Sequence, residues 1–186
     1  NAPTFISDSD IMTAYLESYL PKDNLTLDKD KFCMLAKTLE DNKPFEKHTY
    51  DGQWKINGER CIIHLEKGED LFNPYKCRYT SRHGNDWTNK LFWMDEIIIP
   101  ALREELKELM IEEDVALDGE LYLPDYTINE INHFIKDATC VQHKALQFWC
   151  YDLCIESMPA ETRHEYLKNN LSVDSPWFGS KEAHLN

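Results

Sequence analysis

Stretches with the residue pattern of β-strands recur along this chain, and amphipathic helical patterns are inserted between them. The strand-like stretches cover residues 53–56, 60–66, 76–81, 115–123 and 145–153. The helical patterns cover residues 89–112, 127–137 and 159–170. This alternation predicts an α+β fold with largely antiparallel sheets and inserted helices.

The first of these helical patterns carries features that predict how it begins and where it bends. Thr88 precedes it, and threonine is a good N-cap residue. Pro100 falls within it, and a proline inside a helix removes a backbone hydrogen bond and clashes with the preceding turn. We therefore expect Thr88 to cap this helix and Pro100 to kink it or divide it in two. Gly119 is expected to bend the strand at residues 115–123.

The first part of the chain has helical patterns only. Apolar residues recur at helical spacing within residues 8–19 and again within residues 27–39. Residues 41–49 are polar, include Pro44 and predict a connector. We expect a helical lead-in at residues 1–44 and a larger unit at residues 45–186.

Composition and charge exclude some classes of protein. The formal net charge of -14 argues against a surface that coats nucleic acid, although an acidic enzyme can still have a locally basic cleft. No apolar run is long enough to span a bilayer, and the N-terminus lacks the order of a signal peptide. The six cysteines form no CxxC pair and no zinc-finger spacing. Cys150 and Cys154 are expected to share a strand face as buried apolar residues. These features predict an intracellular protein that is not secreted and does not enter a membrane.

The strongest local motif is Lys55-Ile56-Asn57-Gly58-Glu59-Arg60. A lysine at the end of a strand, facing a cleft beside a glycine turn, can be desolvated and become nucleophilic at neutral pH. The alternative is a solvated lysine before a turn, and the six residues alone leave both open.

Three further segments combine chemically active residues with turns. Residues 80–88 place Ser81 and Arg82 at a strand end, before a glycine. Residues 117–121 place Asp118 and Glu120 around a glycine, and residues 147–153 form an aromatic strand that ends in Asp152-Leu153. Each segment also suits a purely structural role as a hairpin turn, a tight turn or a core strand. However, a hairpin turn needs no arginine, and a core strand gains nothing from an aspartate at its end.

In this order and rough spacing, the segments resemble the KxDGxR, SRxGxxWT, LDGEL and FDL motifs of ATP-dependent DNA ligases. Residues 34–38, Met-Leu-Ala-Lys-Thr, resemble the PMLAKT sequence that precedes them. The resemblance covers roughly residues 33–167. It implies an ATP-grasp-like nucleotidyltransferase domain that forms lysyl-AMP and transfers AMP to a 5′-phosphate at a DNA nick.

The resemblance also implies a role for each matching residue. Lys55 would attack the α-phosphate of ATP, and Gln53, where the family often has Glu, would contact the adenine edge. Arg60 would contact the ribose and later the nick end, and Arg82 would hold a phosphate. Glu120 would lie in the ribose and metal region.

The implied ligands are ATP, Mg²⁺ and nicked duplex DNA. Tyr151 stands where the family usually has Phe and would stack on adenine, while Trp54 and Ile56 flank the nucleophile. Mg²⁺ would neutralise charge as pyrophosphate leaves, with Glu120 as its ligand. The expected catalytic residues are Lys55, Arg60, Arg82 and Glu120. The expected nucleotide-binding residues are Gln53, Trp54, Lys55, Ile56, Arg60, Arg82, Glu120 and Tyr151.

Two departures from the family pattern bear on activity. Asn57 stands where the family usually has Asp, which removes a charge beside Lys55. No EGxV-type segment or KxK-type strand follows Leu171. The resemblance therefore implies an incomplete domain that needs the rest of the adenylation domain and the oligonucleotide-binding (OB) domain. For the 186-residue chain alone, we expect little or no ligation.

Two other functions remain compatible with the sequence. An RNA ligase or a capping-type nucleotidyltransferase would keep the fold and change the substrate, although residues 34–38 and 81–88 favour DNA. A non-catalytic binding module of ligase fold would suit the acidic charge and the lack of the later lysine motif.

Overall fold

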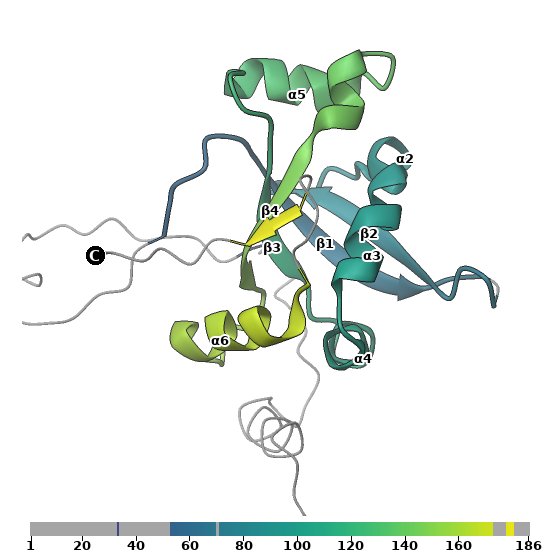
Figure 1. Ribbon diagram of the computed structural model, residues 1–186, viewed down its shortest axis with the longest axis vertical. Coiled ribbons are helices and arrows are strands. Elements are labelled where there is room, and N and C mark those ends of the chain that lie inside the picture. The colour runs from purple at the N-terminus through teal and green to yellow at the C-terminus, as the bar shows by residue number, and fades with distance from the viewer. Residues whose placement is uncertain (1–32, 34–52, 70, 173–177, 181–186) are drawn as a thin grey trace, which may run out of the picture.

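The computed structural model describes residues 33, 53–69, 71–172 and 178–180, and it centres on a five-stranded sheet (Figure 1). The strands are β1 (Glu59–Lys67), β2 (Tyr75–Ser81), β3 (Leu117–Tyr122), β4 (Gln147–Leu153) and β5 (Phe178–Ser180). Their order is β2-β1-β3-β4-β5, and only the β4–β5 pair of this sheet is parallel. The α+β class and the largely antiparallel sheet are confirmed, whereas β5 lies where the sequence predicts no strand.

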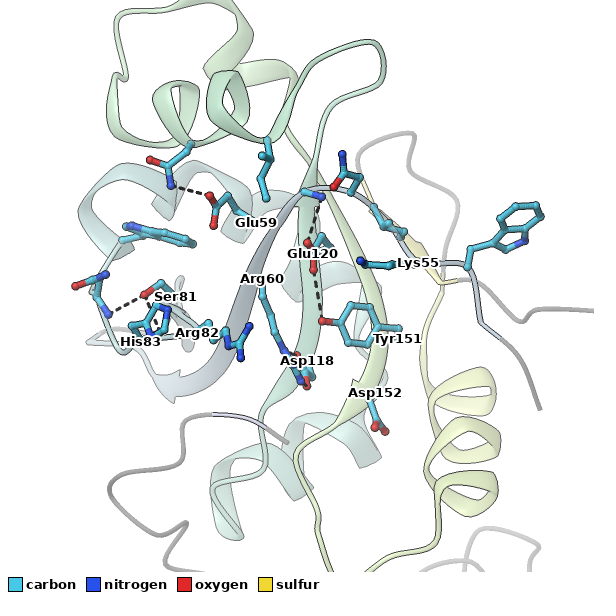
Figure 2. Close-up of a pocket in the computed structure, with 18 of the residues that line it drawn as sticks. Lys55, Glu59, Arg60, Ser81, Arg82, His83, Asp118, Glu120, Tyr151 and Asp152 are labelled. Atoms are coloured by element: carbon cyan, nitrogen blue, oxygen red, sulfur yellow. Dashed lines mark hydrogen bonds and ion pairs between the residues drawn. The ribbon is translucent and has the colours of Figure 1, made fainter. Parts of the chain in front are cut away.

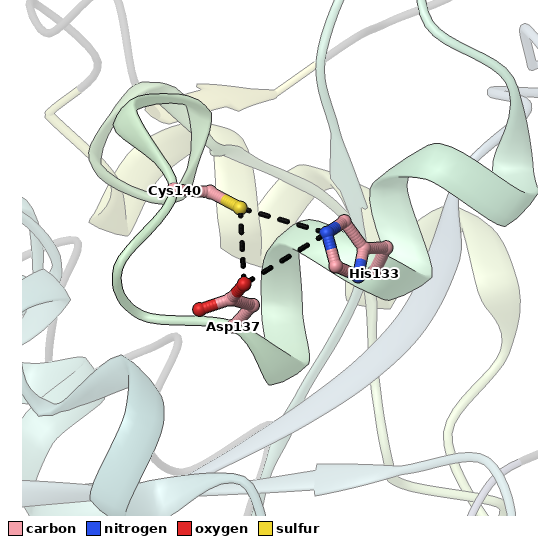
Figure 3. A group of neighbouring side chains, drawn as sticks. All are labelled: His133, Asp137 and Cys140. Carbon is pink, nitrogen blue, oxygen red and sulfur yellow. Dashed lines mark hydrogen bonds and ion pairs between the residues drawn. The ribbon is translucent and has the colours of Figure 1, made fainter.

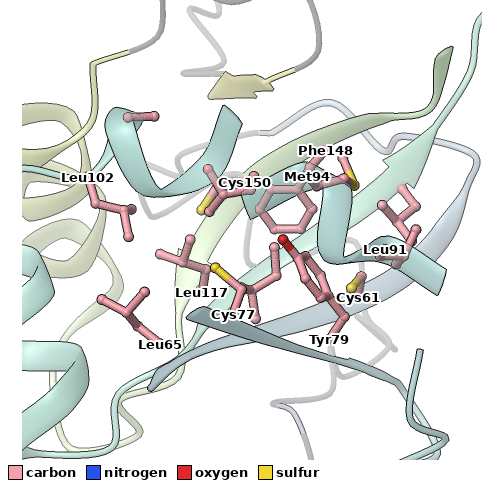
Figure 4. Close-up of a cluster of buried hydrophobic side chains, with 14 of the residues drawn as sticks. Cys61, Leu65, Cys77, Tyr79, Leu91, Met94, Leu102, Leu117, Phe148 and Cys150 are labelled. Carbon is pink, nitrogen blue, oxygen red and sulfur yellow. The ribbon is translucent and has the colours of Figure 1, made fainter. Parts of the chain in front are cut away.

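Helices cover one face of the sheet. Alternate residues of β1 point into the main core on this face: Cys61, Ile63 and Leu65. Each helix adds at least one buried side chain to the same core. These helices are α2 (Thr88–Leu91), α3 (Asp95–Ala101), α4 (Glu104–Glu112), α5 (Ile128–Lys136) and α6 (Ala160–Asn170). Figure 4 shows part of this core, where Tyr79 of β2 and Phe148 of β4 pack beside helical side chains. The apolar residues of the strands and of the helices are therefore buried together in one core between the sheet and the helices.

The opposite face of the sheet carries a second, smaller cluster and most of the polar residues. Ile62, Ala116, Cys154 and Cys33 form this cluster, and all four are buried. Cys150 belongs instead to the main core. The expectation that Cys150 and Cys154 share a face is therefore wrong, because an irregularity in β4 between them changes the alternation.

The helical pattern at residues 89–112 forms four pieces: α2, the 3-10 helix η2 (Phe92–Met94), α3 and α4. Pro100 lies inside α3, and the last break follows at Leu102 and Arg103. Leu102 is extended and bridges to Leu171, and the Arg103 N–H donates to the Asn170 carbonyl at 3.0 Å. The expected division therefore occurs, and pairing with the segment after α6 fixes its position.

The N-termini of α5 and α2 differ in their caps: α5 has a side-chain cap that was not predicted, and the predicted cap at Thr88 is wrong. Thr127 caps α5, since its hydroxyl accepts from the Glu130 N–H at 3.4 Å and the Glu130 carboxylate accepts from the Thr127 N–H. Thr88 is already inside α2 and does not cap it. Its hydroxyl accepts from the Tyr79 N–H of β2 at 3.1 Å, so a tertiary contact uses the group that the cap would need.

The stretch at residues 53–56 is not a strand, which corrects the sequence prediction. The first strand begins at Glu59, where it pairs with Leu121 of β3. Gly58 lies at this entry, and a Cβ there would be 2.1 Å from the Leu121 carbonyl oxygen. The glycine is needed because β3 approaches the backbone closely. Within the part of the chain that the structure describes, the segment before it pairs with no strand.

The predicted helices at residues 8–19 and 27–39 lie outside the described residues, apart from Cys33. Within the part of the chain that the structure describes, none of the helices has the length and apolar character needed to cross a bilayer.

Candidate active site

A broad cleft of about 1320 Å³ opens on the face of the sheet away from the main core (Figure 2). It is lined by residues 53–60, by the end of β2 and the loop after it, and by two or three side chains each from β3, α5 and β4. All eight residues that the sequence assigns to nucleotide binding lie along this cleft: Gln53, Trp54, Lys55, Ile56, Arg60, Arg82, Glu120 and Tyr151. The structure therefore brings together four motifs that are far apart in the sequence.

The strand register explains how these side chains come to share one face. Arg60 of β1 pairs with Glu120 of β3, and Asp118 of β3 pairs with Asp152 of β4. Directly opposed residues of neighbouring strands project to the same side of a sheet. The register shifts between β3 and β4, because Gly119 pairs with Cys150 while Asp118 pairs with Asp152. This β-bulge leaves Tyr151 as an extra residue, so Tyr151 and Asp152 both line the cleft.

Arg60 is held by a buried aspartate that the sequence did not assign to the site. The Arg60 Nε donates to Asp118 Oδ1 at 2.9 Å, and Arg60 Nη2 donates to Asp118 Oδ2. The Asp118 side chain is 1% exposed, whereas that of Arg60 is 20% exposed. Burial raises the pKa of Asp118, and the two hydrogen bonds from Arg60 oppose that rise. A two-point contact fixes the plane of the guanidinium, so Asp118 orients Arg60 toward the cleft.

Glu120 lies between the entry to β1 and the bulge in β4. Its Oε1 accepts from the Gly58 N–H at 3.2 Å, and its Oε2 accepts from the Tyr151 hydroxyl at 3.5 Å. Burial raises the pKa of Glu120 to about 7, although the Gly58 N–H and Arg60 both favour the ionised form. A nearby cation would therefore stabilise the ionised form of Glu120.

The raised pKa of Glu120 predicts a stabilising substitution at alkaline pH. Between its ordinary value of 4.5 and about 7, the folded state keeps a proton that the unfolded state releases, so stability falls as the pH rises through this window. Glu120→Gln removes the charge and retains both hydrogen-bonding positions. Since Glu120 is only partly buried, we expect a gain of about 1–2 kcal/mol in the free energy of unfolding at pH 8.

The measurement is urea unfolding of both proteins at pH 8 and pH 4. The gain should disappear near pH 4, where the folded and unfolded states both hold the proton. Glu69→Gln, at an exposed loop position, is the matched control and should show no pH-dependent difference. An equal effect of Glu120→Gln at the two pH values would contradict the argument.

Lys55 lies on the extended segment before β1 and is exposed. Figure 2 shows its side chain pointing into the cleft, toward Glu120 and Tyr151. The prediction that Lys55 lies on a strand is therefore wrong, and its exposed position fits the solvated lysine of the two alternatives. Among the described residues the segment pairs with no strand, and Lys55 is open to solvent.

Gln53 and Tyr151 connect the lysine segment to β4. The Gln53 Nε2 donates to the Tyr151 carbonyl at 3.0 Å and lies 3.2 Å from His164 Nε2. The Arg60 Cζ lies 5.8 Å from the centroid of the Tyr151 ring. Burial raises the pKa of Tyr151, with Asp118 adding to that rise. Tyr151 is thus a neutral aromatic residue beside a cation, and Gln53 links its backbone to the segment that carries Lys55.

A tight turn presents Arg82. The Ser81 hydroxyl accepts from the Asn85 N–H at 2.9 Å and from the His83 N–H at 3.3 Å. Gly84 has φ 78°, a left-handed conformation that favours glycine. Arg82 is exposed, and Figure 2 shows it extending toward the Arg60–Asp118 pair.

Two further contacts in the cleft were missed by sequence reasoning. Asp152 accepts from Arg163 Nε at 2.7 Å and from Arg163 Nη2 at 2.9 Å, which ties α6 to the end of β4. Asn132 of α5 donates to Glu59 Oε1 at 2.8 Å. The aspartate at the end of the aromatic strand was a usable signal, but nothing in the sequence marks its pairing with Arg163.

The charge of the cleft is mixed rather than basic. Its cationic side chains are Lys55, Arg60, Arg82 and Lys136. Its carboxylates are Glu59, Asp86, Asp118, Glu120 and Asp152. Arginines pair with Asp118 and Asp152, whereas Glu120 accepts only from an N–H and a hydroxyl among the contacts described above. Such a cleft suits a polyphosphate that arrives with a cation.

A family model and a solved structure are similar to this chain. A family model described as the ATP dependent DNA ligase domain matches residues 33–176. Among solved structures, the ligase domain of M. tuberculosis LigD is similar at 20% sequence identity with a TM-score of 0.43. That match covers 71% of this chain and 38% of the LigD chain, so this chain spans well under half of it. The comparison with curated proteins gives no match. Because the family model spans well over half of the sequence and includes every motif in the cleft, the chain belongs to the family of ATP-dependent DNA ligase domains.

Proposed function

We propose that this chain is the adenylate-accepting part of an ATP-dependent DNA ligase, with Lys55 as the nucleophile. The observation that carries the proposal is the convergence of four separate motifs on one cleft, with the Lys55 side chain pointing into it. Family membership supports the use of ATP. The proposed acceptor of AMP is a 5′-phosphate at a nick in duplex DNA.

The proposed reaction forms a bond between Lys55 Nζ and the α-phosphorus of ATP. The lysine first releases a proton to solvent, because only the neutral amine is a nucleophile. As the N–P bond forms, the bond from the α-phosphorus to the bridging oxygen breaks and pyrophosphate leaves. In the next step a 5′-phosphate oxygen attacks the same phosphorus, the N–P bond breaks, and the AMP moves to the nick.

The proposed roles of the other residues follow from their positions in the cleft. Tyr151 stacks on the adenine, and such stacking is worth about 1–3 kcal/mol per base in other proteins. Gln53 contacts the adenine edge from the segment it shares with Trp54 and Ile56. Arg60, held in one orientation by Asp118, contacts the ribose and later the nick end.

Two residues are proposed to bind the charged parts of the substrate: Arg82 a phosphate, and Glu120 the metal ion that accompanies it. Arg82 holds a phosphate, and the turn that presents it leaves the guanidinium exposed in the cleft. Glu120 fits an Mg²⁺ ion, because its oxygens are hard ligands and its ionised form is disfavoured by burial until a cation arrives. When bound, Mg²⁺ would neutralise negative charge on the phosphates.

Sealing of the nick is proposed to need further parts of the ligase architecture. These are the remainder of the adenylation domain and the oligonucleotide-binding domain, which would close over the cleft and bind the duplex. The family match favours DNA over RNA as the acceptor. A comparison of nicked duplex DNA with nicked duplex RNA, each offered to the adenylated protein, would separate these substrates.

Peptide mapping tests the position of the nucleophile. The protein is incubated with Mg²⁺ and ATP labelled at the α-phosphate, then denatured and digested. We expect label on the peptide that contains Lys55, and none when the label is on the γ-phosphate. Lys136 lines the same cleft and is the internal control. Label on Lys136, or the absence of a stable adduct, would contradict the proposal.

A further inference from the structure

A group of three metal-ligand side chains lies at the C-terminal end of α5, apart from the cleft (Figure 3). The group consists of His133, Asp137 and Cys140, whose possible ligand atoms all lie within 4.8 Å of one another. Cys140 Sγ is 3.6 Å from His133 Nε2 and 3.4 Å from Asp137 Oδ2. His133 Nε2 is 3.9 Å from Asp137 Oδ2. None of the three lines the cleft.

The Asp137 carboxylate is already oriented by its neighbours. Its Oδ1 accepts from the Thr139 N–H at 3.0 Å and from the Thr139 hydroxyl at 2.6 Å. These bonds hold one oxygen of the carboxylate in place. The other oxygen, Oδ2, is the atom that faces His133 and Cys140. One carboxylate oxygen is thus held by hydrogen bonds while the other faces the two neighbouring ligand atoms. Hydrogen bonds from outer-shell groups orient metal ligands in proteins in the same way.

The loop that carries Asp137 and Cys140 is fixed at both ends. The Asp137 N–H donates to the His133 carbonyl at 2.9 Å, and the Cys140 N–H donates to the Asp137 carbonyl at 3.2 Å. After the loop comes the 3-10 helix η3 (Val141–Ala145), whose His143 is 1% exposed. His143 Nδ1 lies 2.8 Å from the Phe134 carbonyl of α5, and the Trp93 indole N–H donates to His143 Nε2 at 3.1 Å. The three ligand side chains therefore project from a braced backbone.

We propose that His133, Asp137 and Cys140 bind a Zn²⁺ ion. One nitrogen, one oxygen and one sulfur ligand suit zinc, which accepts all three types in a tetrahedral arrangement, with water in the fourth position. A thiolate and an imidazole are poor ligands for Mg²⁺. On binding, the S–H bond of Cys140 breaks, its proton passes to solvent, and a Zn–S bond forms. No atom changes its oxidation state when the ion binds.

The place of this site in the fold suggests its effect. The same helix α5 presents Ile128, Asn132 and Lys136 to the cleft, and Asn132 bonds to Glu59 beside the nucleophile segment. A metal joining the end of α5 to the following loop would stabilise this side of the cleft. The proposed zinc site does not depend on the proposed adenylation reaction, so the two proposals are tested separately.

Cobalt substitution and zinc titration test the proposal on the whole chain without a polyhistidine tag. We expect Co²⁺ to give a thiolate-to-metal charge-transfer band, and Zn²⁺ to abolish it by competition. Cys140→Ser should remove the band, and Cys140→Ser and His133→Ala should each weaken Zn²⁺ binding by about 100-fold or more. Thr139→Val keeps all three ligands and should weaken binding by about 10-fold, as expected for an outer-shell partner.

The control is His164→Ala, which removes a histidine away from the proposed site, 4.0 Å from the cleft carboxylate of Asp152. This variant should bind Zn²⁺ as the unmodified protein does. Circular dichroism of each variant excludes unfolding, and exposed His133 is a safe position to replace. The proposal is overturned if no charge-transfer band appears. It is equally overturned if His164→Ala removes zinc binding while Cys140→Ser leaves it unchanged.

Discussion

Lys55→Arg is expected to abolish the AMP adduct, with a loss of at least about 10⁴-fold in its rate of formation, as for other removed nucleophiles. Arginine keeps the positive charge and the length of the side chain. Its guanidinium is not deprotonated in proteins and so provides no neutral amine to attack the α-phosphorus. A loss of the adduct in this variant would therefore show that Lys55 acts as the nucleophile, and not only through the attraction of its charge for the triphosphate.

Stability and nucleotide binding should be unaffected by this substitution. Lys55 is exposed on a segment outside the sheet, so the melting temperature is expected to change little. The thermal shift caused by ATP should also persist, since the charge remains. Lys67→Arg, at the exposed end of β1 and outside the cleft, is the matched control and should adenylate normally. An adduct that survives in Lys55→Arg would place the nucleophile elsewhere.

The sequence could predict the approximate positions of β1 to β4 along the chain, because each of these strands is marked by local residue patterns. It could not predict the β-bulge at Tyr151, because a bulge depends on how β3 and β4 align rather than on either strand alone. The motifs predict a binding role for Tyr151, and its side chain lines the cleft. Only the register shows that the extra residue lets Tyr151 and Asp152 project to the same face.

The failures at Lys55 and Thr88 share a physical cause. A strand needs a partner, and the segment that contains Lys55 has no neighbouring strand in the described part of the chain. A capping hydroxyl must be free, and that of Thr88 is used by the Tyr79 N–H. Local sequence preferences predict what a residue can do, whereas the tertiary contacts decide which option it takes.

Long-range pairing explains the residues that were missed. Asp118 was recognised as part of a two-carboxylate motif, yet its partner Arg60 lies in a different motif and on a different strand. The cysteine spacing contains no zinc-finger pattern. It did not reveal the group at His133, because a mixed site needs the fold to bring an imidazole, a carboxylate and a thiol together.

The pair formed by Arg60 and Asp118 predicts the largest effect on stability. Asp118→Asn removes the charge that compensates the part-buried guanidinium, with little change in volume. We expect a loss of about 3 kcal/mol in the free energy of unfolding, because breaking a buried ion pair leaves one charge without its partner. The measurement is urea unfolding at pH 7.

A double-mutant cycle separates this pairing from general disruption of the core. Arg60→Met should also destabilise the protein, since it leaves buried Asp118 without its arginine. The variant with both substitutions should lose less than the sum of the two, with a coupling of about 2 kcal/mol. The matched control is the exposed pair Arg78 and Glu66, joined at 2.8 Å between Nε and Oε1. Glu66→Gln should cost less than about 1 kcal/mol, as is usual for surface ion pairs.

Activity distinguishes an orienting role of Asp118 from a purely structural one. If Asp118 fixes Arg60 for contact with the ribose, Asp118→Asn should raise the KM for ATP more than it lowers kcat for adduct formation, measured at a temperature where the variant is folded. Arg60→Lys restores a cation but not the two-point contact, so it should not restore the KM. An unchanged KM in folded Asp118→Asn would confine Asp118 to stability. Additive effects in the cycle would show instead that the two residues act independently.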